Sequence, residues 1–198
     1  MSWSLGEIRA LSVKAARGSS MDWGMAEEAG FAVQWLEEHG LNGVRALAQY
    51  LSQVHRGDTY NDEHCPLKLG CMVSDMNNWE LLEGKECHEP VLLIPFIANV
   101  VKDASISLSW AEINALINGN GVKIDDIEIL VSRPSSSKQS LHIKLHDAPC
   151  EVLSYKTRVS EGEASYVAIL NALAHKVYAP ATEASRLSGA GAGLNDND

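Results

Sequence analysis

The sequence predicts an α+β protein in which an N-terminal three-helix unit and a C-terminal helix pack on a mainly antiparallel sheet. Apolar residues recur at three- and four-residue spacing through the first quarter of the chain, which is the period of amphipathic helices. From residue 91 to residue 156 the pattern changes to short strand-like segments that follow one another directly. Strands in direct succession favour an antiparallel sheet over parallel βαβ units. A helical pattern returns near the C-terminus.

The first helix is predicted to begin at a capping box, Ser4-x-x-Glu7. In this motif a hydroxyl and a carboxylate accept hydrogen bonds from the N–H groups that the first turn leaves without intrahelical partners. Gly18 is expected to end the helix, since glycine commonly follows the last helical turn. The buried face is predicted to consist of Leu5, Ile8, Leu11 and Ala15.

The second helix is predicted to begin after Asp22, whose side chain can cap the first turn, and to end at Gly40. Glu27 and Glu28 lie near its N-terminal end, where the helix dipole favours negative charge. The buried stripe is predicted to consist of Met25, Ala29, Ala32, Val33 and Leu36.

A third helix is predicted from about Gly43 to Gly57. Its inward positions are Val44, Leu47, Leu51 and Val54. The first 57 residues are therefore expected to form one helical unit, because three amphipathic helices can bury their apolar stripes against one another.

Residues 58–90 are expected to form an irregular, acidic connection. Between Asn61 and Pro90 there are seven acidic and two basic residues, with few aliphatic side chains. The stretch Leu67–Val73 is the one segment here that is compatible with a strand. Connections of this length in a compact domain are commonly lids or binding loops.

The strand-rich part extends from residue 91 to residue 156. It begins with a buried run over Val91–Val101 and an alternating strand over Ala104–Trp110. Ser109-x-x-Glu112 is expected to cap a short helix that ends at Gly119, and Asn118-Gly-Asn-Gly121 to form a tight turn. Further strands are predicted over Asp126–Ser132, Ser140–Leu145 and Cys150–Leu153, with a loop from Arg133 to Gln139.

A second capping box, Ser160-x-x-Glu163, is predicted to begin the C-terminal helix, which Pro180 breaks. This helix is expected to bury Val167, Leu170, Ala174 and Val177. The tail that follows has no periodicity. We therefore expect a single domain over residues 1–198, made of a helical part (1–57), an acidic connection (58–90), a strand-rich part (91–156) and a C-terminal helix with a glycine-rich tail (157–198).

Composition excludes several classes of function. The chain has 26 acidic and 16 basic residues, a net charge of −10, which argues against a nucleic-acid binder or a protein of anionic membrane surfaces. The N-terminus carries no basic segment followed by an apolar one, and no apolar run is long enough to span a bilayer. A cytoplasmic protein with reduced cysteines is the expectation, because four cysteines in 198 residues do not make a disulfide scaffold.

No cofactor is predicted, and a structural zinc ion is the alternative. The candidate ligands share one segment: His64, Cys65, Cys71, Cys87 and His88. Thiolate and imidazole are the usual ligands of structural zinc. However, the sequence contains no C-x-x-C pair, and buried, inert thiols beside surface histidines would give the same pattern.

Three stretches resemble, as a set, a family of uncharacterised, mostly bacterial proteins of about 200 residues. They are Ser4-Leu-Gly-Glu-Ile8 with Lys14-Ala-Ala-Arg-Gly18, the stretch Trp23-Gly-Met-Ala-Glu-Glu-Ala-Gly30, and a C-terminal Ser185-Arg-x-x-Gly-Ala-Gly-Ala-Gly193. The resemblance brings no reaction and no catalytic residues with it. It implies that the glycine-rich tail is an ordered part of the folded unit.

The first functional hypothesis is a small enzyme or ligand-binding protein that acts on an anionic metabolite carrying a carboxylate or a phosphate. Free N–H groups and the dipole at the start of the second helix suit an anion, and arginine can hold a carboxylate with two parallel hydrogen bonds. Glu27 or Glu28 would act as acid or base. The substrate-binding candidates are Arg17, Trp23, Tyr178, Ser185, Arg186, Gly189, Gly191 and Gly193. This hypothesis requires that the N-terminal and C-terminal segments lie together.

The second hypothesis is a non-catalytic accessory protein that forms a homodimer or binds a partner enzyme. The acidic segment 61–90 would face the partner. This hypothesis predicts an exposed apolar patch larger than a monomer usually carries, and no polar pocket. The sequence leaves the choice between the two hypotheses open.

Overall fold

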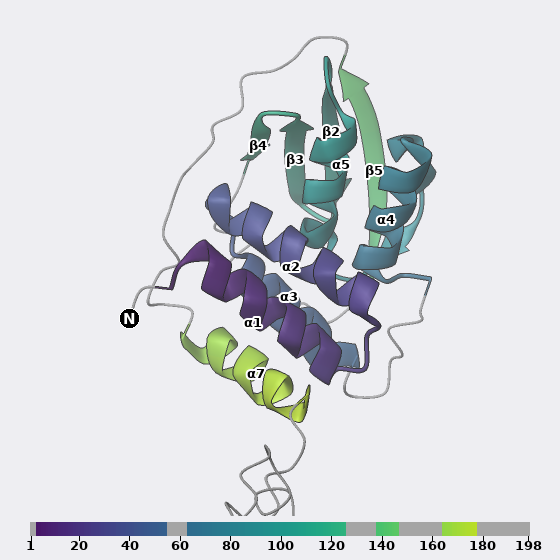
Figure 1. Ribbon diagram of the computed structural model, residues 1–198. Helices are drawn as coiled ribbons and strands as arrows, with labels where there is room; N and C mark the ends of the chain where they lie inside the picture. Colours follow the sequence, from purple (N-terminus) through teal and green to yellow (C-terminus); the bar gives the residue numbers. More distant parts are fainter. Residues whose placement is uncertain (1–2, 55–62, 126–137, 147–163, 178–198) are drawn as a thin grey trace, which may run out of the picture.

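The computed structural model describes residues 3–54, 63–125, 138–146 and 164–177, and it confirms the predicted α+β class (Figure 1). Four helices come first: α1 (Leu5–Gly18), α2 (Trp23–Glu38), α3 (Gly43–Val54) and α4 (Pro66–Met76). Short elements follow: η1 (Trp79–Leu82), β1 (Glu86–Cys87), η2 (Pro90–Leu93) and α5 (Ile94–Val100). The remaining elements are β2 (Ser105–Trp110), β3 (Ile113–Asn118), β4 (Gly121–Ile124), β5 (Gln139–His146), α7 (Ala164–Ala174) and η4 (His175–Val177).

The first two helices begin where their capping residues predict. Ser4 and Glu7 form the complete capping box at the start of α1, and the Asp22 side chain accepts a hydrogen bond of 2.8 Å from the N–H of Met25 in α2. Most of the predicted inward-facing residues of α1 to α3 are buried. The N-terminal helical unit is thus determined by local signals that the sequence carries openly.

The sheet is antiparallel throughout, with the strand order β1-β5-β2-β3-β4. The predicted strands Ala104–Trp110 and Ser140–Leu145 correspond to β2 and β5, and the turn at Asn118–Gly121 joins β3 to β4. Alternation along β2 turns Ile106, Leu108 and Trp110 into the core. The serines between them therefore lie on the opposite face, because successive side chains of a strand point to opposite faces.

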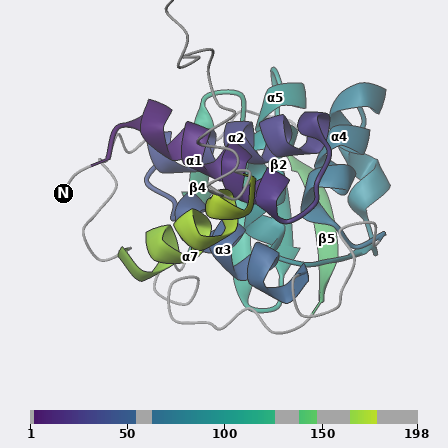
Figure 2. The ribbon, with the colours of Figure 1, turned by 60° about the horizontal axis from the view of Figure 1, so that its bottom comes forward.

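The C-terminal helix α7 packs on α1 and α3, on the side of these helices that is away from the sheet (Figures 1 and 2). This differs from the prediction, which placed it on the sheet itself. Val167, Leu170, Leu173 and Ala174 are its buried residues. Gly18 permits this packing, since a Cβ there would overlap the carbonyl group of Leu173. Predicted as buried, Val177 is 42% exposed in η4, past the end of the helix.

The prediction of an irregular connection over 58–90 is wrong for residues 63–90, which contain α4, η1, β1 and the start of η2. The strand-like stretch Leu67–Val73 lies inside α4. Proline at the first helical turn and a left-handed Asn77 at the C-cap delimit this helix. From Leu67 onward, apolar and other residues alternate in the sequence, which resembles a strand. The helical period is not visible there, because α4 buries small and apolar residues on more than one of its faces.

Two further predictions in the strand-rich part are wrong. The buried run Val91–Val101 forms η2 and α5, not a strand, because a helix buried on all sides has no polar face to reveal its period. The helix expected between Ser109 and Gly119 is the strand β3. Ala111, with a φ of 48°, lies in the turn that connects β2 to β3.

Several predicted elements lie outside the described residues. They are the end of the third helix near Gly57, the strands Asp126–Ser132 and Cys150–Leu153, most of the loop from Arg133, the capping box at Ser160 and the tail from Tyr178.

Candidate ligand site between α1 and α7

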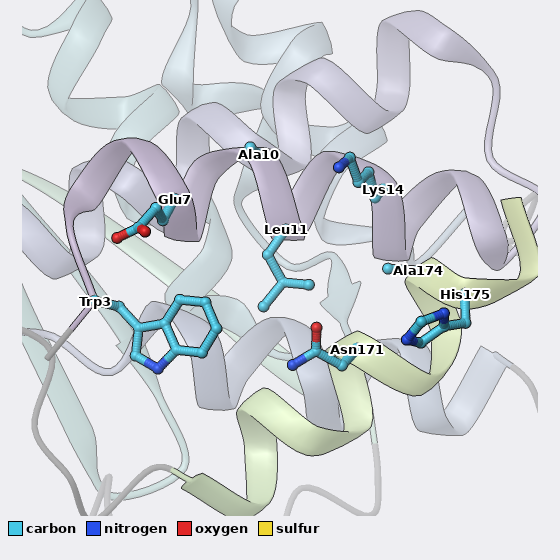
Figure 3. Close-up of a pocket in the computed structure, with 8 residues that line it drawn as sticks. All are labelled: Trp3, Glu7, Ala10, Leu11, Lys14, Asn171, Ala174 and His175. Carbon is cyan, nitrogen blue, oxygen red and sulfur yellow. The ribbon is translucent and has the colours of Figure 1, made fainter. Parts of the chain in front are cut away.

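A pocket of about 300 Å³ lies between α1 and α7. Its lining residues are Trp3, Glu7, Ala10, Leu11, Lys14, Asn171, Ala174 and His175 (Figure 3). The contributions from α1 recur at three- and four-residue spacing, so they form one stripe along the helix. The stripe from α7 faces it. The site therefore exists only because the two helices, more than 140 residues apart in the sequence, lie side by side.

The two ends of the pocket differ in chemistry. Trp3 and Glu7 lie at one end, and Lys14 and His175 lie at the other (Figure 3). Leu11 and Asn171 lie between them (Figure 3). An indole and a leucine offer apolar surface, whereas the amide can both donate and accept hydrogen bonds. The pocket thus suits a small molecule with an apolar part and a polar or charged group.

The carboxylate of Glu7 is engaged in holding the start of α1. Its Oε2 accepts hydrogen bonds of 2.8 Å from both the N–H and the hydroxyl of Ser4. These bonds lower the pKa of Glu7, because they stabilise the charged form. Lys14, at the other end of the α1 stripe, therefore gives the pocket a cationic end that is separated from this carboxylate by about two helical turns.

Arg17 follows Lys14 by one helical turn and lies beside the start of α2. Its Nη1 donates a hydrogen bond to the carbonyl oxygen of Met21, and its guanidinium lies 4.8 Å from the centroid of the Trp23 ring. The Trp23 side chain is 63% exposed. The structure thus brings together two of the predicted binding residues, Arg17 and Trp23, in a cation–π contact.

Residues 3–83 match a family model described as a protein of unknown function, DUF3726. Residues 3–83 are a DUF3726 domain. No curated protein and no solved structure matches the chain. The match contains the two N-terminal stretches that carried the resemblance to uncharacterised proteins, and the C-terminal glycine-rich stretch lies beyond it. Within the described residues, no helix is long and apolar enough to cross a membrane.

The DUF3726 domain supplies the α1 wall of the pocket, and α7 lies outside it. The two acidic candidates, Glu27 and Glu28, belong to the domain but do not line the pocket. Burial raises the pKa of Glu28, and the nearby carboxylates of Asp75 and Glu27 raise it further, while Arg9 lowers it. Glu28 is therefore close enough to Asp75 of α4 and Arg9 of α1 for their charges to act on it.

The remaining predicted binding residues, Tyr178, Ser185, Arg186, Gly189, Gly191 and Gly193, lie outside the described residues. The described chain ends at Val177, two residues after His175, which lines the pocket. At the same place Gly18 contacts the end of α7. The described part of the C-terminal region, α7 with η4, thus packs beside the end of α1 that carries Lys14 and Arg17.

The histidines and cysteines considered as zinc ligands gather around the start of α4 and β1, with His64 and His88 ring centroids 6.2 Å apart. The Cys87 thiol donates a hydrogen bond of 3.1 Å to the carbonyl oxygen of His88. Burial raises the pKa of Cys87 well above its ordinary value, with further contributions from Cys65 and Glu89. Across the described ranges, no group of three or more His, Cys, Asp or Glu side chains could hold a metal ion.

Sequence reasoning missed Trp3, Asn171 and His175 as members of a site, and it treated Glu7 only as a cap. Helical periodicity could have placed Trp3, Glu7 and Lys14 on one stripe of α1. It could not have indicated that this stripe faces α7, because the contact between the two helices is long-range.

Proposed function

We propose that this chain is a small-molecule binding protein, and that its ligand is an anionic metabolite with a carboxylate or phosphate group, bound in the pocket between α1 and α7. The observation that carries the proposal is the polarity of this pocket, which has Lys14 and His175 at one end and apolar surface from Trp3 and Leu11 beside it. An acid with a short apolar body matches that distribution.

The charge of the site supports an anion in spite of the acidic chain. Among the described residues, Glu7 is the one carboxylate that lines the pocket, and its oxygen accepts two hydrogen bonds from Ser4. Lys14 contributes an ammonium group, and His175 contributes imidazole nitrogens that can form hydrogen bonds to an acid group. Since the chain as a whole has a net charge of −10, the cationic end of the pocket would direct an anionic ligand to this site and not to the rest of the surface.

We further propose that the C-terminal segment completes the site, with Arg186 holding the acid group and the glycines allowing close approach of the backbone to the ligand. This part of the proposal is supported by the position of His175, which lines the pocket two residues before the described chain ends at Val177. Tyr178 and Ser185 lie between His175 and Arg186 in the sequence, so the same segment would carry them toward the ligand.

The test is a thermal-shift screen of the full chain against carboxylic acids and phosphate esters, each paired with its uncharged amide or alcohol. A ligand that binds only the folded state raises the melting temperature in a saturable manner. We expect a shift from acids and none from their uncharged pairs. Titration calorimetry then gives the affinity for each active acid.

Charge-removing variants locate the site. Lys14→Met retains most of the length of the side chain and removes the charge, and Lys123→Met on β4 is the matched control outside the pocket. We expect Lys14→Met to weaken binding by tenfold or more, which corresponds to about 1.4 kcal/mol, and Lys123→Met to leave it unchanged. Equal affinities of the two variants, or no response to any acid, would contradict the proposal and favour the accessory-protein alternative.

A further inference from the structure

A serine and a histidine on neighbouring strands of the sheet lie in hydrogen-bond contact. The Oγ of Ser107 on β2 is 2.7 Å from the Nε2 of His146 on β5, and both side chains are half-buried. The register pairs Ser107 with Lys144 and Ser105 with His146, so the contact is a diagonal one on a single face. This face is the one opposite to Ile106 and Leu108, which belong to the core.

The serine two residues farther along the same strand has a different environment. The hydroxyl of Ser109 donates a hydrogen bond of 2.8 Å to the Oδ1 of Asn114, which in turn donates from Nδ2 to Asp125. The hydroxyl of Ser109 is therefore part of a hydrogen-bond network with Asn114 and Asp125. Ser107, by contrast, contacts an imidazole nitrogen.

We propose that Ser107 and His146 form a nucleophile–base pair that transfers or hydrolyses acyl groups of esters or thioesters. This proposal is independent of the ligand site between α1 and α7. A serine hydroxyl becomes a useful nucleophile when a base within hydrogen-bond reach accepts its proton, and Nε2 is the nitrogen that performs this role in serine–histidine pairs. Two adjacent strands hold both groups, which fixes their separation better than a loop does.

The proposed reaction needs only Ser107, His146, the acyl substrate and water. Ser107 Oγ bonds to the carbonyl carbon while His146 Nε2 takes the hydroxyl proton, and the alcohol or thiol then leaves with that proton. The acyl group remains on Ser107. A water molecule next gives a proton to Nε2 and attacks the acyl carbon, and the imidazolium returns its proton to Ser107 as the acid departs.

The position of Lys144 indicates which charge the substrate carries. It is exposed and lies directly opposite Ser107 in the register, and opposite residues on one face have Cβ atoms about 4.5–5.5 Å apart. An ammonium group at this position attracts an acyl group that carries a carboxylate. We therefore expect p-nitrophenyl succinate to react faster than p-nitrophenyl acetate, and Lys144→Met to remove that preference.

The decisive test uses a fluorophosphonate probe on the full chain. The probe phosphonylates an activated serine with loss of fluoride, and peptide mass spectrometry identifies the labelled residue. We expect the label on Ser107, a loss of about 100-fold or more in labelling rate for Ser107→Ala and His146→Gln, and unchanged labelling for Ser109→Ala. Circular dichroism of each variant confirms that it is folded.

Other outcomes would overturn the proposal. If Ser107→Ala takes label as the parent chain does, the reactive group is elsewhere. If the folded parent chain takes no label under conditions that label trypsin, the contact between Ser107 and His146 is only a structural bond between strands. In that case Ser107→Ala lowers the melting temperature and changes no reaction.

Discussion

Replacement of Gly18 by alanine is expected to loosen the packing of α7 on α1. A Cβ at this position would overlap the carbonyl oxygen and carbon of Leu173. Both are backbone atoms of α7, so no side-chain rotation relieves the overlap. The helix has to shift as a body, and the shift reduces the burial of the residues through which α7 contacts the rest of the fold.

The size of the effect follows from what α7 buries. Val167, Leu170 and Leu173 are each no more than 6% exposed. Complete burial of one such side chain contributes roughly 1.5–3 kcal/mol, so the three together contribute about 5–9 kcal/mol before the cost of ordering the helix. Partial loss of this contact is expected to lower the free energy of unfolding by about 2–4 kcal/mol, within the range for overpacked sites.

Urea denaturation and thermal melting of the full chain measure this change. For a chain of this length the melting temperature is expected to fall by roughly 5–15 °C. Gly6→Ala in the same helix is the matched control, because nothing lies within 4 Å of a Cβ there. That control is expected to be neutral or to gain up to about 1 kcal/mol, since alanine favours helix over glycine. A Gly18→Ala chain as stable as the Gly6→Ala chain would refute the reasoning.

Three further results are expected. Glu28→Gln should raise the melting temperature at pH 7, because the pKa of Glu28 is raised in the folded state and its ionisation therefore costs more there than in the unfolded chain; the gain should shrink as the pH falls below the raised folded pKa and vanish below the unfolded value of about 4.3. Glu7→Ala should lower the melting temperature most at neutral pH, since the lowered pKa of Glu7 stabilises the fold above its unfolded value of about 4.3 and this contribution is lost as the pH falls through the folded value. Cys71, whose pKa burial raises to about 12, should resist Ellman's reagent at pH 8 in the native chain and react fully in urea, as peptide mass spectrometry can follow; rapid reaction of native Cys71 would contradict its burial.

The helices α1 and α2 were predictable because each begins at a side chain that caps it. Ser4, Glu7 and Asp22 act within three residues of their own position, so their effect can be inferred from a short stretch of sequence. Strands β2 and β5 were predictable for a similar reason. Apolar and polar residues alternate along these strands, because one face of the sheet packs in the core and the other does not.

The elements α4 and α5 were missed because their surroundings, and not their own patterns, determine them. Residues of α5 from Ile94 to Ala98 are buried on every side, so polarity carries no period there. In α4, Gly70 packs against the ring of Phe96 in α5, and a Cβ would overlap that ring. Such contacts depend on which elements lie together, and the sequence alone does not determine this.

The candidate site illustrates the same limit. The sequence predicted that the segment around Arg17 and Trp23 meets the C-terminal segment from Tyr178 to Gly193, which lies outside the described residues, whereas the described contact is between α1 and α7. Glu27 and Glu28, the acidic candidates, are not among the described residues that line the pocket between α1 and α7. Lys14 and His175 come together only through the packing of two helices.

The DUF3726 match ends at residue 83, yet the helices that it contains depend on a partner beyond that point. Arg45 of α3 lies 5.7 Å from the centroid of the Tyr166 ring, and α1 receives α7 at Gly18. Both contacts are made with α7, which also supplies Asn171 and Ala174 to the pocket, and η4 directly after it supplies His175. The same packing therefore stabilises the N-terminal helices and forms the proposed ligand site. A ligand that contacts both walls must strengthen this packing, so binding and the stability of α7 should change together.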